Sequence, residues 1–223
     1  MPFENREQAA QMLARRLHEY RGQHPLVLAI PRGAVPMGKT VADALDGELD
    51  VVLVRKLRAP HNPELAIGSI DENGTVYLGP ETRDLWTEPY LKTEKKAQLQ
   101  TLRQRRQMYQ PVGSPIDAAG RVVIVLDDGI ATGSTVIAAL RAVRIRHPAK
   151  LIVATAVASS DTLQRIRPEA DDVVCLETPA VLYAIGYHFL DFSQVSDEDV
   201  VATLRDARRD RAALDAGAGR SIA

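Results

Sequence analysis

Five apolar runs rich in β-branched residues and leucine recur along the chain, with helical segments between most of them. They cover residues 25–30, 49–54, 121–126, 150–158 and 171–176. Such runs are typical of strands covered on both faces, and their alternation with helices predicts a parallel sheet flanked by helices. At 223 residues the chain can bury one such core without a disulfide or a metal. We expect one α/β domain over residues 1–212, followed by a disordered tail at 213–223.

Two segments add to this plan. Residues 64–79 read ELAIGSI, DENG and TVYLG, which predicts a β-hairpin with its turn at Asn73-Gly74, inserted between the second and third core strands at about 58–80. Residues 5–20 show helical spacing of apolar positions after Asn5, a suitable N-cap residue. Residues 89–110 predict a long charged helix with a solvated basic face.

Charge and composition exclude several classes of protein. The 28 Lys and Arg residues balance 29 Asp and Glu residues, so we expect no general binding of nucleic acid. The single cysteine, Cys175, fits a reducing compartment, and the first residues lack the apolar core of a signal peptide. No stretch approaches the ~20 apolar residues of a membrane span. These features predict a cytoplasmic protein that does not insert into membranes.

The segment VVIVLDDGIATGST at 122–135 carries the clearest chemical signal. It places Asp127 and Asp128 at the carboxyl end of a predicted strand, where their mutual repulsion calls for a positive or hydrogen-bonding partner. The following loop offers backbone N–H groups and hydroxyls at a helix N-terminus, which suits a monophosphate; it comprises Ala131, Thr132, Gly133, Ser134 and Thr135. Glycine-rich nucleotide motifs are missing from the sequence. We therefore expect a phosphorylated sugar, held with Mg²⁺, to be the partner of the carboxylates.

This segment resembles the signature of type I phosphoribosyltransferases that binds 5-phosphoribosyl 1-pyrophosphate (PRPP). RKLRAPHNPELAIGSI at 55–70 is similar, more narrowly, to a group of bacterial predicted phosphoribosyltransferases, and the likeness extends over about residues 3–202. The resemblance implies the family fold and a Mg²⁺-dependent transfer of phosphoribosyl from PRPP to a small nitrogen heterocycle, with release of pyrophosphate. It also implies a homodimer, a lid made by the hairpin, and a hood at about 177–195.

The resemblance assigns residues to the donor site as well. AIPRGAVPMG at 29–38 corresponds to the pyrophosphate loop, with Arg32 and Gly33 as ligands and a cis peptide bond between Pro31 and Arg32. Arg55 and Lys56, expected to end the second strand, would add cations for the same pyrophosphate. In the resulting scheme the ribose hydroxyls bind the two carboxylates, and the 5-phosphate binds the loop at 131–135. The catalytic set is Asp127, Asp128, Arg32, Lys56 and Glu64.

Two of these assignments leave alternatives open. Ala131 stands where the hypoxanthine-guanine branch of the family carries a basic aspartate, so Glu64 in the lid is our candidate acid or base. It could equally cap or solvate the hairpin. Tyr183 and Tyr187 could stack on the acceptor while Asp191 reads an amine, although core packing explains such aromatics equally well.

Two other functions compete with the transferase. The same fold could sense PRPP or a nucleotide without catalysis. The other alternative is a phosphatase or another sugar-phosphate enzyme on an α/β scaffold, but neither acid is followed by the pattern that aspartyl-phosphate chemistry needs. The five histidines show no metal-ligand spacing.

Overall fold

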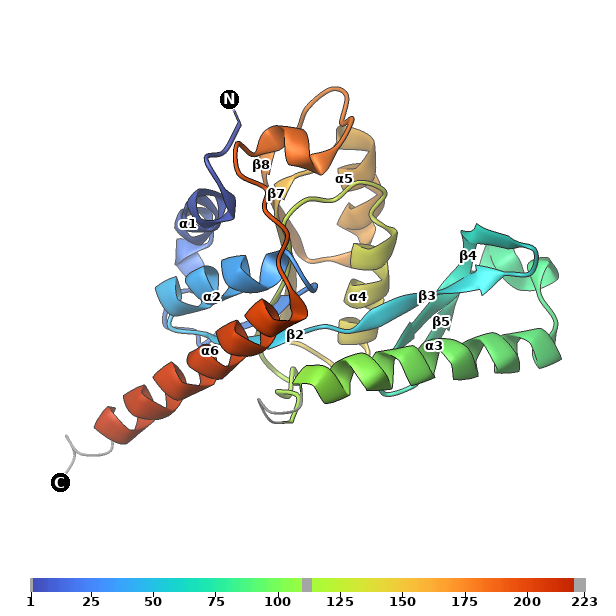
Figure 1. The fold of residues 1–223 in the computed structure, drawn as a ribbon, viewed down its shortest axis with the longest axis horizontal. Coiled ribbons are helices and arrows are strands. Elements are labelled where there is room, and N and C mark those ends of the chain that lie inside the picture. Colours follow the sequence, from blue (N-terminus) through green and yellow to red (C-terminus); the bar gives the residue numbers. More distant parts are fainter. Residues whose placement is uncertain (1, 110–113, 219–223) are drawn as a thin grey trace.

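A parallel sheet forms the centre of the molecule (Figure 1). The computed structural model describes residues 2–109 and 114–218, apart from the side chains of residues 63, 64, 80, 81 and 213–218. The sheet has the order β2-β1-β6-β7-β8. Its strands are β1 (Leu26–Ala29), β2 (Glu48–Val51), β6 (Val122–Asp127), β7 (Lys150–Val157) and β8 (Asp172–Glu177). All five predicted strands are present, so the predicted fold class is confirmed.

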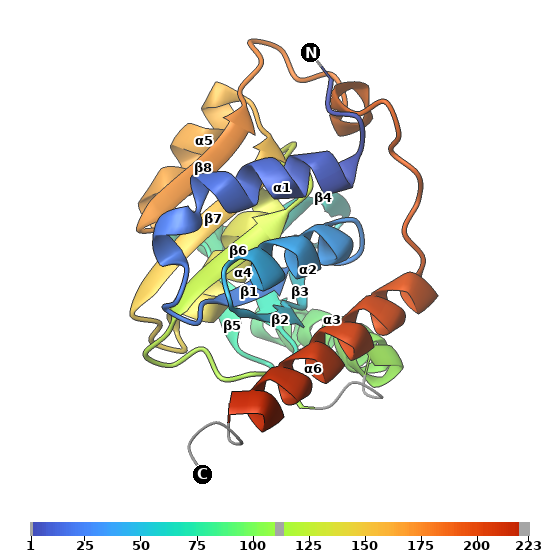
Figure 2. The same cartoon turned by 90° about the vertical axis from the view of Figure 1, so that its left-hand side faces the viewer.

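Helices cover both faces of this sheet. One face packs against α1 (Arg6–Arg16), α2 (Ala34–Ala44) and α6 (Asp197–Ala218), which lie on the side seen in Figure 2. The other face packs against α4 (Ser134–Arg144) and α5 (Ser160–Ile166). Along β6, Val123 and Val125 face one layer while Ile124 and Leu126 face the other, and all four have no exposed surface. Burial on both sides explains why the strands read as continuous apolar runs.

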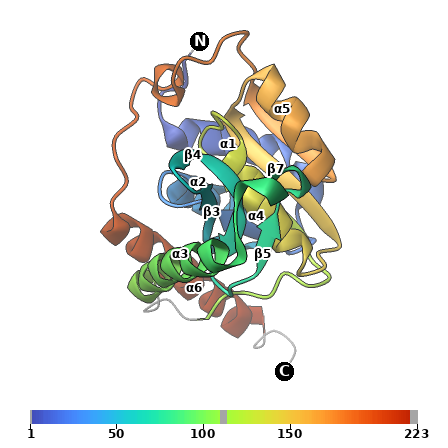
Figure 3. The ribbon, with the colours of Figure 1, turned by 90° about the vertical axis from the view of Figure 1, so that its right-hand side faces the viewer.

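The segment between β2 and β6 forms a second body, residues 54–109, which we call the lid. It holds an antiparallel sheet of β3 (Val54–Ala59), β4 (Asn62–Asp71) and β5 (Val76–Leu78), followed by the turn η2 (Pro80–Leu85) and α3 (Glu88–Tyr109). The predicted hairpin turn is confirmed, since Gly74 has a φ of 85° and its N–H donates to the Asp71 carbonyl at 3.0 Å. Strands β3 and β4 pack against α4, and Figure 3 views the molecule from this side.

The predicted second strand is wrong at its end. β2 stops at Val51, and the chain crosses at residues 52 and 53 into β3 of the lid. The small sheet therefore begins at Val54, four residues before the predicted start of the hairpin at 58. Val52 and Leu53 are each 3% exposed, because they are buried in the joint between the two bodies. The apolar run continues through the joint, so composition does not reveal the break.

The first and last helices test two predictions made from the sequence. The predicted cap is confirmed, because the Asn5 side chain accepts from the Gln8 N–H at 2.9 Å. At the other end α6 continues to Ala218, so residues 213–218 are helical where a tail was predicted. The alanines of ALDAGA favour a helix strongly enough to extend it. Residues 219–223 lie outside the described residues. No helix in the described part of the chain has the length and apolar character to cross a membrane.

Three short 3₁₀ turns complete the fold, and one of them lies in the hood, residues 177–195. They are η1 (His18–Tyr20), η4 (Arg167–Glu169) and η5 (Ile185–His188). The hood pairs with the start of the chain, because the Phe3 N–H donates to the His188 carbonyl and the Leu190 N–H donates to the Phe3 carbonyl, each at 2.8 Å. Figure 2 shows the N-terminus beside this segment.

Candidate functional site

Two neighbouring carboxylates stand at the carboxyl end of β6. Asp127 is the last residue of the strand and Asp128 the next. Burial raises the pKa of the Asp127 carboxyl well above its usual value, and the charge of Asp128 raises it further. A backbone hydrogen bond from the Asp128 N–H, at 3.0 Å, opposes this only in part. The environment therefore favours the protonated form of the Asp127 carboxyl.

The chain itself supplies a cation for Asp128, which the sequence did not predict. Arg6 Nε donates to Asp128 Oδ2 at 2.8 Å across a separation of 122 residues. The same guanidinium donates to the Ser193 carbonyl at 2.7 Å and lies 3.8 Å from the centre of the Phe192 ring. The Arg6 and Asp128 side chains are each 14% exposed. Arg6 thus links the opening helix, the carboxylates and the hood, and no local sequence signal marks it.

The loop after β1 lies directly against Asp128. The peptide bond between Pro31 and Arg32 is cis, as predicted. Gly33 has an ordinary helical φ of −56°, so its backbone conformation does not itself require glycine. Glycine is required for a different reason, since a Cβ at Gly33 would stand 2.0 Å from Asp128 Oδ2. Arg32 forms an ion pair with Asp197 of α6 at 3.7 Å and keeps a third of its side chain exposed.

The predicted phosphate loop connects β6 to α4. Its carbonyls are held from the α5 side, because the Thr162 hydroxyl donates to the Ala131 carbonyl at 2.7 Å and Arg165 donates to the Thr132 carbonyl at 3.1 Å. Gly133 precedes α4 with a φ of 75°, a conformation that glycine adopts without strain. The hydroxyls of Thr132 and Ser134 lie 3.3 Å apart at the start of the helix. The first helical N–H groups and these hydroxyls can therefore converge on an anion.

Arg55 and Lys56 are not at the end of β2, because both lie in β3 of the lid. Successive side chains of a strand point to opposite faces, so the two cations separate. Arg55 lines a cavity of about 100 Å³ with Pro31, Thr135 and Arg105 of α3. Lys56 lines a different cavity of about 320 Å³ beside α4. The structure therefore brings only Arg55 close to the pyrophosphate loop.

Arg105 is a second residue that the sequence did not single out. Burial lowers the pKa of Arg55, and the charges of Arg58 and Arg105 lower it further. The Nε of Arg55 donates to Gln98 Oε1 at 2.5 Å, a neutral acceptor, and the charge of Glu94 opposes the lowering of the Arg55 pKa only in part. Two guanidinium groups beside one cavity favour an anion of more than one charge.

The hood contributes an exposed aromatic surface. Tyr183 and Tyr187 are 83% and 78% exposed, so the alternative that they pack in the core is wrong. The side chain of Asp191 accepts from the Ser193 N–H at 2.9 Å, and hydrogen bonds from Ser193 lower the pKa of this carboxyl. Ile185 covers Gly129, where a Cβ would lie 2.3 Å from its Cγ2. Ile185 thus fixes the hood directly over the segment that follows Asp128.

Glu64 belongs to β4, but its side chain lies outside the described residues. Its role in acid or base chemistry stays a prediction. Among the described residues no three His, Cys, Asp or Glu side chains group as a metal site.

Comparison with known proteins adds independent findings. The family model described as "Phosphoribosyl transferase domain" matches residues 3–190. The Mycobacterium tuberculosis protein named "Putative phosphoribosyl transferase Rv0571c" is 39% identical over 222 residues, which cover 97% of this chain and 50% of that protein. The chain therefore spans about half the length of the curated relatives it matches. The crystal structure of TT1426 from Thermus thermophilus is 41% identical, with a TM-score of 0.87 over 92% of this chain and 99% of that one.

Proposed function

The chain belongs to the phosphoribosyl transferase domain family, and on that premise we propose that it transfers phosphoribosyl from PRPP to a nitrogen acceptor, releasing pyrophosphate. The observation that best supports this is the contact between Gly33 and Asp128. It sets the carboxylates suited to ribose hydroxyls directly beside the loop suited to pyrophosphate. The bond that breaks in this reaction joins those two parts of the donor.

The residues divide the work of that reaction. Asp127 and Asp128 accept hydrogen bonds from the ribose hydroxyls and stabilise the positive charge that grows on the ring as the bond breaks. Arg32, Arg55 and Arg105 lie on the side where pyrophosphate leaves and offset its negative charge. Loop 131–135 holds the 5-phosphate at the N-terminus of α4.

We also propose that Mg²⁺ binds at the two carboxylates. Asp127 and Asp128 offer carboxylate oxygens, the ligands that this ion prefers. No third acidic residue joins them in the described part of the chain, so the remaining ligands would come from substrate and water. When bound, the ion supplies positive charge that stabilises the departing pyrophosphate.

The acceptor is the least constrained part of the proposal. Ala131 offers no side-chain base beside the loop, which disfavours an acceptor that depends on one there. The exposed rings of Tyr183 and Tyr187 can stack on a flat heterocycle, and the Asp191 carboxylate can accept from an amine. We therefore propose a small purine- or pyrimidine-like acceptor.

A panel of nitrogen heterocycles, incubated with PRPP and Mg²⁺, tests the function through pyrophosphate release. Turnover with one of them, lost in the Asp127→Asn, Asp128→Asn double variant, would support the transferase. Calorimetric PRPP binding with no release across the panel would instead favour the sensor.

A further inference from the structure

Three parts of the chain that are distant in sequence meet at the carboxylate of Asp197, the first residue of α6. Its Oδ1 accepts a hydrogen bond from the phenol of Tyr109, the last residue of α3, at 2.8 Å. Its Oδ2 lies 3.7 Å from Nη1 of Arg32, in the loop after β1. One carboxylate therefore joins the lid, the start of α6 and the loop suited to pyrophosphate.

The helix does not need this carboxylate to cap its own N-terminus. Ser196 and Asp199 form a reciprocal cap, in which the Asp199 N–H donates to the Ser196 hydroxyl at 3.0 Å and the Ser196 N–H donates to Asp199 Oδ2 at 2.9 Å. Glu198, the other acid of the first turn, is exposed. Asp197 differs from both acids, because its two carboxylate oxygens face partners outside the helix.

Tyr109 holds the carboxylate in place. Its side chain is 1% exposed and packs in the hydrophobic core, so the phenol has little freedom to move. Burial raises the pKa of the Tyr109 phenol, and the hydrogen bond to Asp197 raises it further. The charges of Arg105 and Arg32 act in the opposite direction, so both arginines lie near the same phenol. The phenol thus remains a proton donor and keeps the Asp197 carboxylate beside Arg32.

Arg32 is held more loosely than the carboxylate. A distance of 3.7 Å is too long for a hydrogen bond, so the two groups attract each other only through their charges. The Arg32 guanidinium donates to no residue in the described ranges 2–109 and 114–218, and a third of the side chain is exposed. Its N–H groups can therefore turn to another anion, whereas the carboxylate stays with Tyr109.

We propose that Asp197 is an internal competitor of pyrophosphate: it pairs with Arg32 until pyrophosphate binds, and it takes the guanidinium back when this product leaves. The inference rests on the proposed function, because it treats Arg32 as a ligand of pyrophosphate. A fixed carboxylate beside an anion site repels the anion and lowers its affinity, which favours product release. Tyr109 positions Asp197 for this role and thereby makes the lid part of the competition.

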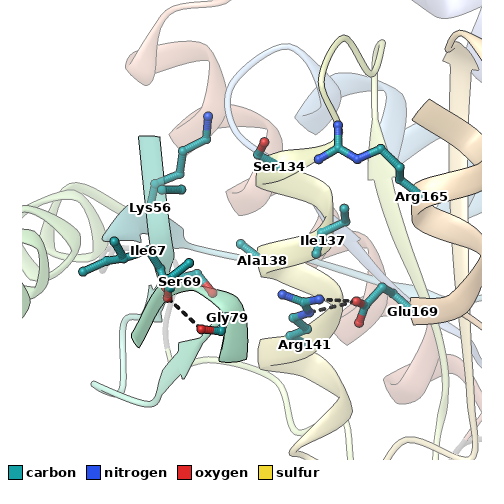
Figure 4. A pocket seen from close by; sticks show the side chains of 13 residues that line it. Lys56, Ile67, Ser69, Gly79, Ser134, Ile137, Ala138, Arg141, Arg165 and Glu169 are labelled. Atoms are coloured by element: carbon teal, nitrogen blue, oxygen red, sulfur yellow. Dashed lines mark hydrogen bonds and ion pairs between the residues drawn. The ribbon is translucent and has the colours of Figure 1, made fainter. Parts of the chain in front are cut away.

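The region suited to the 5-phosphate supplies a control anion in the same molecule. Figure 4 shows Ser134 at the N-terminal end of α4, beside the larger cavity of about 320 Å³. The described residues that line this cavity do not include Arg32, Tyr109 or Asp197. Ribose 5-phosphate, which carries no pyrophosphate, should therefore bind independently of Asp197.

Calorimetry with pyrophosphate, and with ribose 5-phosphate in parallel, tests the competition. Asp197→Asn keeps an oxygen that can accept from Tyr109 and removes only the charge, so it should raise pyrophosphate affinity by roughly 3- to 20-fold. It should change ribose 5-phosphate affinity by less than about twofold, because that anion binds away from Arg32. Glu198→Gln removes the same charge from the same turn of α6 and is the matched control, with pyrophosphate affinity expected within about twofold of the wild type.

A second variant tests the part played by the lid. Tyr109→Phe removes only the hydroxyl that holds Asp197, and it should raise pyrophosphate affinity by a smaller factor, about two- to fivefold. Added to Asp197→Asn it should give no further gain, because Tyr109 acts through that carboxylate. With PRPP as substrate, Asp197→Asn should lower KM more than it changes kcat, since the donor carries the same pyrophosphate group. A gain in affinity cannot arise from a loss of folding, so these variants separate binding from stability.

Three results would overturn the inference. They are a wild type that does not bind pyrophosphate, an Asp197→Asn variant whose pyrophosphate affinity is unchanged or weaker, and an equal gain in Glu198→Gln. The proposed function fails separately, if PRPP is never turned over with any acceptor. A gain measured with pyrophosphate alone would still support Asp197 as the competitor in that case.

Discussion

In the parallel sheet all four residues of β1 are buried, whereas in the lid Val54, Arg55 and Lys56 at the start of β3 are half-buried. The sheet ends in Asp127 and Asp128, and the lid carries Arg55, Lys56 and Arg105 toward the cavities. A tightly packed body thus positions the carboxylates, while a less buried body carries cations. Under the proposed function an anionic donor contacts both bodies, because its carboxylate ligands belong to the sheet and its cationic ligands to the lid.

The carboxylates should show the largest effect. Replacing Asp127 and Asp128 together with Asn should weaken PRPP binding by about 2–6 kcal/mol, at about 1–3 kcal/mol for each lost charged hydrogen bond. Calorimetry measures this, with Asp84→Asn in the exposed part of the lid as the control. Unchanged PRPP affinity in the double variant would remove the ribose assignment.

Arg6 should come next, because it joins the carboxylates to the hood. Arg6→Met leaves the Asp128 side chain, 14% exposed, without its guanidinium partner, which should lower the free energy of unfolding by about 1–3 kcal/mol. Arg6→Lys should recover only part, since it keeps the charge and loses the planar donor group. Denaturant unfolding in a double-mutant cycle with Asp128→Asn should give a coupling energy above about 1 kcal/mol. Additive effects would show that the two side chains do not interact.

The pH dependence of stability distinguishes the two acids. The raised pKa of Asp127 means that the folded state holds a proton which the unfolded chain releases above about pH 4. The stability that Asp127 contributes is therefore present at low pH. It declines as the pH rises, by at most about 1.4 kcal/mol per pH unit, until the pH exceeds the pKa of Asp127 in the folded state. Asp127→Asn should match the wild type near pH 4 and exceed it near pH 7 in thermal unfolding. A gap that narrows as pH rises would contradict this assignment.

The lid arginines should have a smaller effect. Arg105→Met should weaken pyrophosphate binding by about 1 kcal/mol, and the difference should shrink as salt is raised. Arg103→Met, on the same helix and exposed, should leave the affinity unchanged. Equal losses of affinity in both variants would indicate that the overall positive charge of α3 attracts pyrophosphate, and that Arg105 does not bind it at a specific site.

The hood tyrosines should matter least for folding. Tyr183→Ala and Tyr187→Ala should each change the free energy of unfolding by less than about 0.5 kcal/mol, because both rings are exposed. The Michaelis constant for the acceptor should rise if the rings stack on it. A stability loss above about 1 kcal/mol would mean that the rings pack against another part of the protein.

The sequence predicted those parts of the molecule that depend on local pattern. Burial on both faces makes a strand apolar throughout, so the five core strands could be predicted from the sequence. Asn73-Gly74 predicted its turn, because these residues adopt the backbone conformation that the turn requires. The end of β2 and the joint at residues 52 and 53 could not be predicted, because a buried connection between two sheets is as apolar as a strand.

The parts that depend on contacts between distant residues were missed. Arg6 is an ordinary first-turn residue of a helix until the fold brings it to Asp128. The separation of Arg55 from Lys56 follows only from their place in β3, which the predicted strand end concealed. Local pattern thus located the carboxylates and the loop, whereas their cationic partners required the tertiary structure.

The number of residues in the joint between β2 and β3 also determines which face of the lid each of its cationic side chains occupies. Adjacent residues of β3 point to opposite faces, so a single-residue insertion or deletion at positions 52 and 53 would exchange the faces of Arg55 and Lys56. A change of two residues would restore them. Whether the number of inserted residues is odd or even therefore decides which face of the lid carries Arg55 and which carries Lys56. Small insertions alone could reverse the placement of these two charges without changing the composition of the lid.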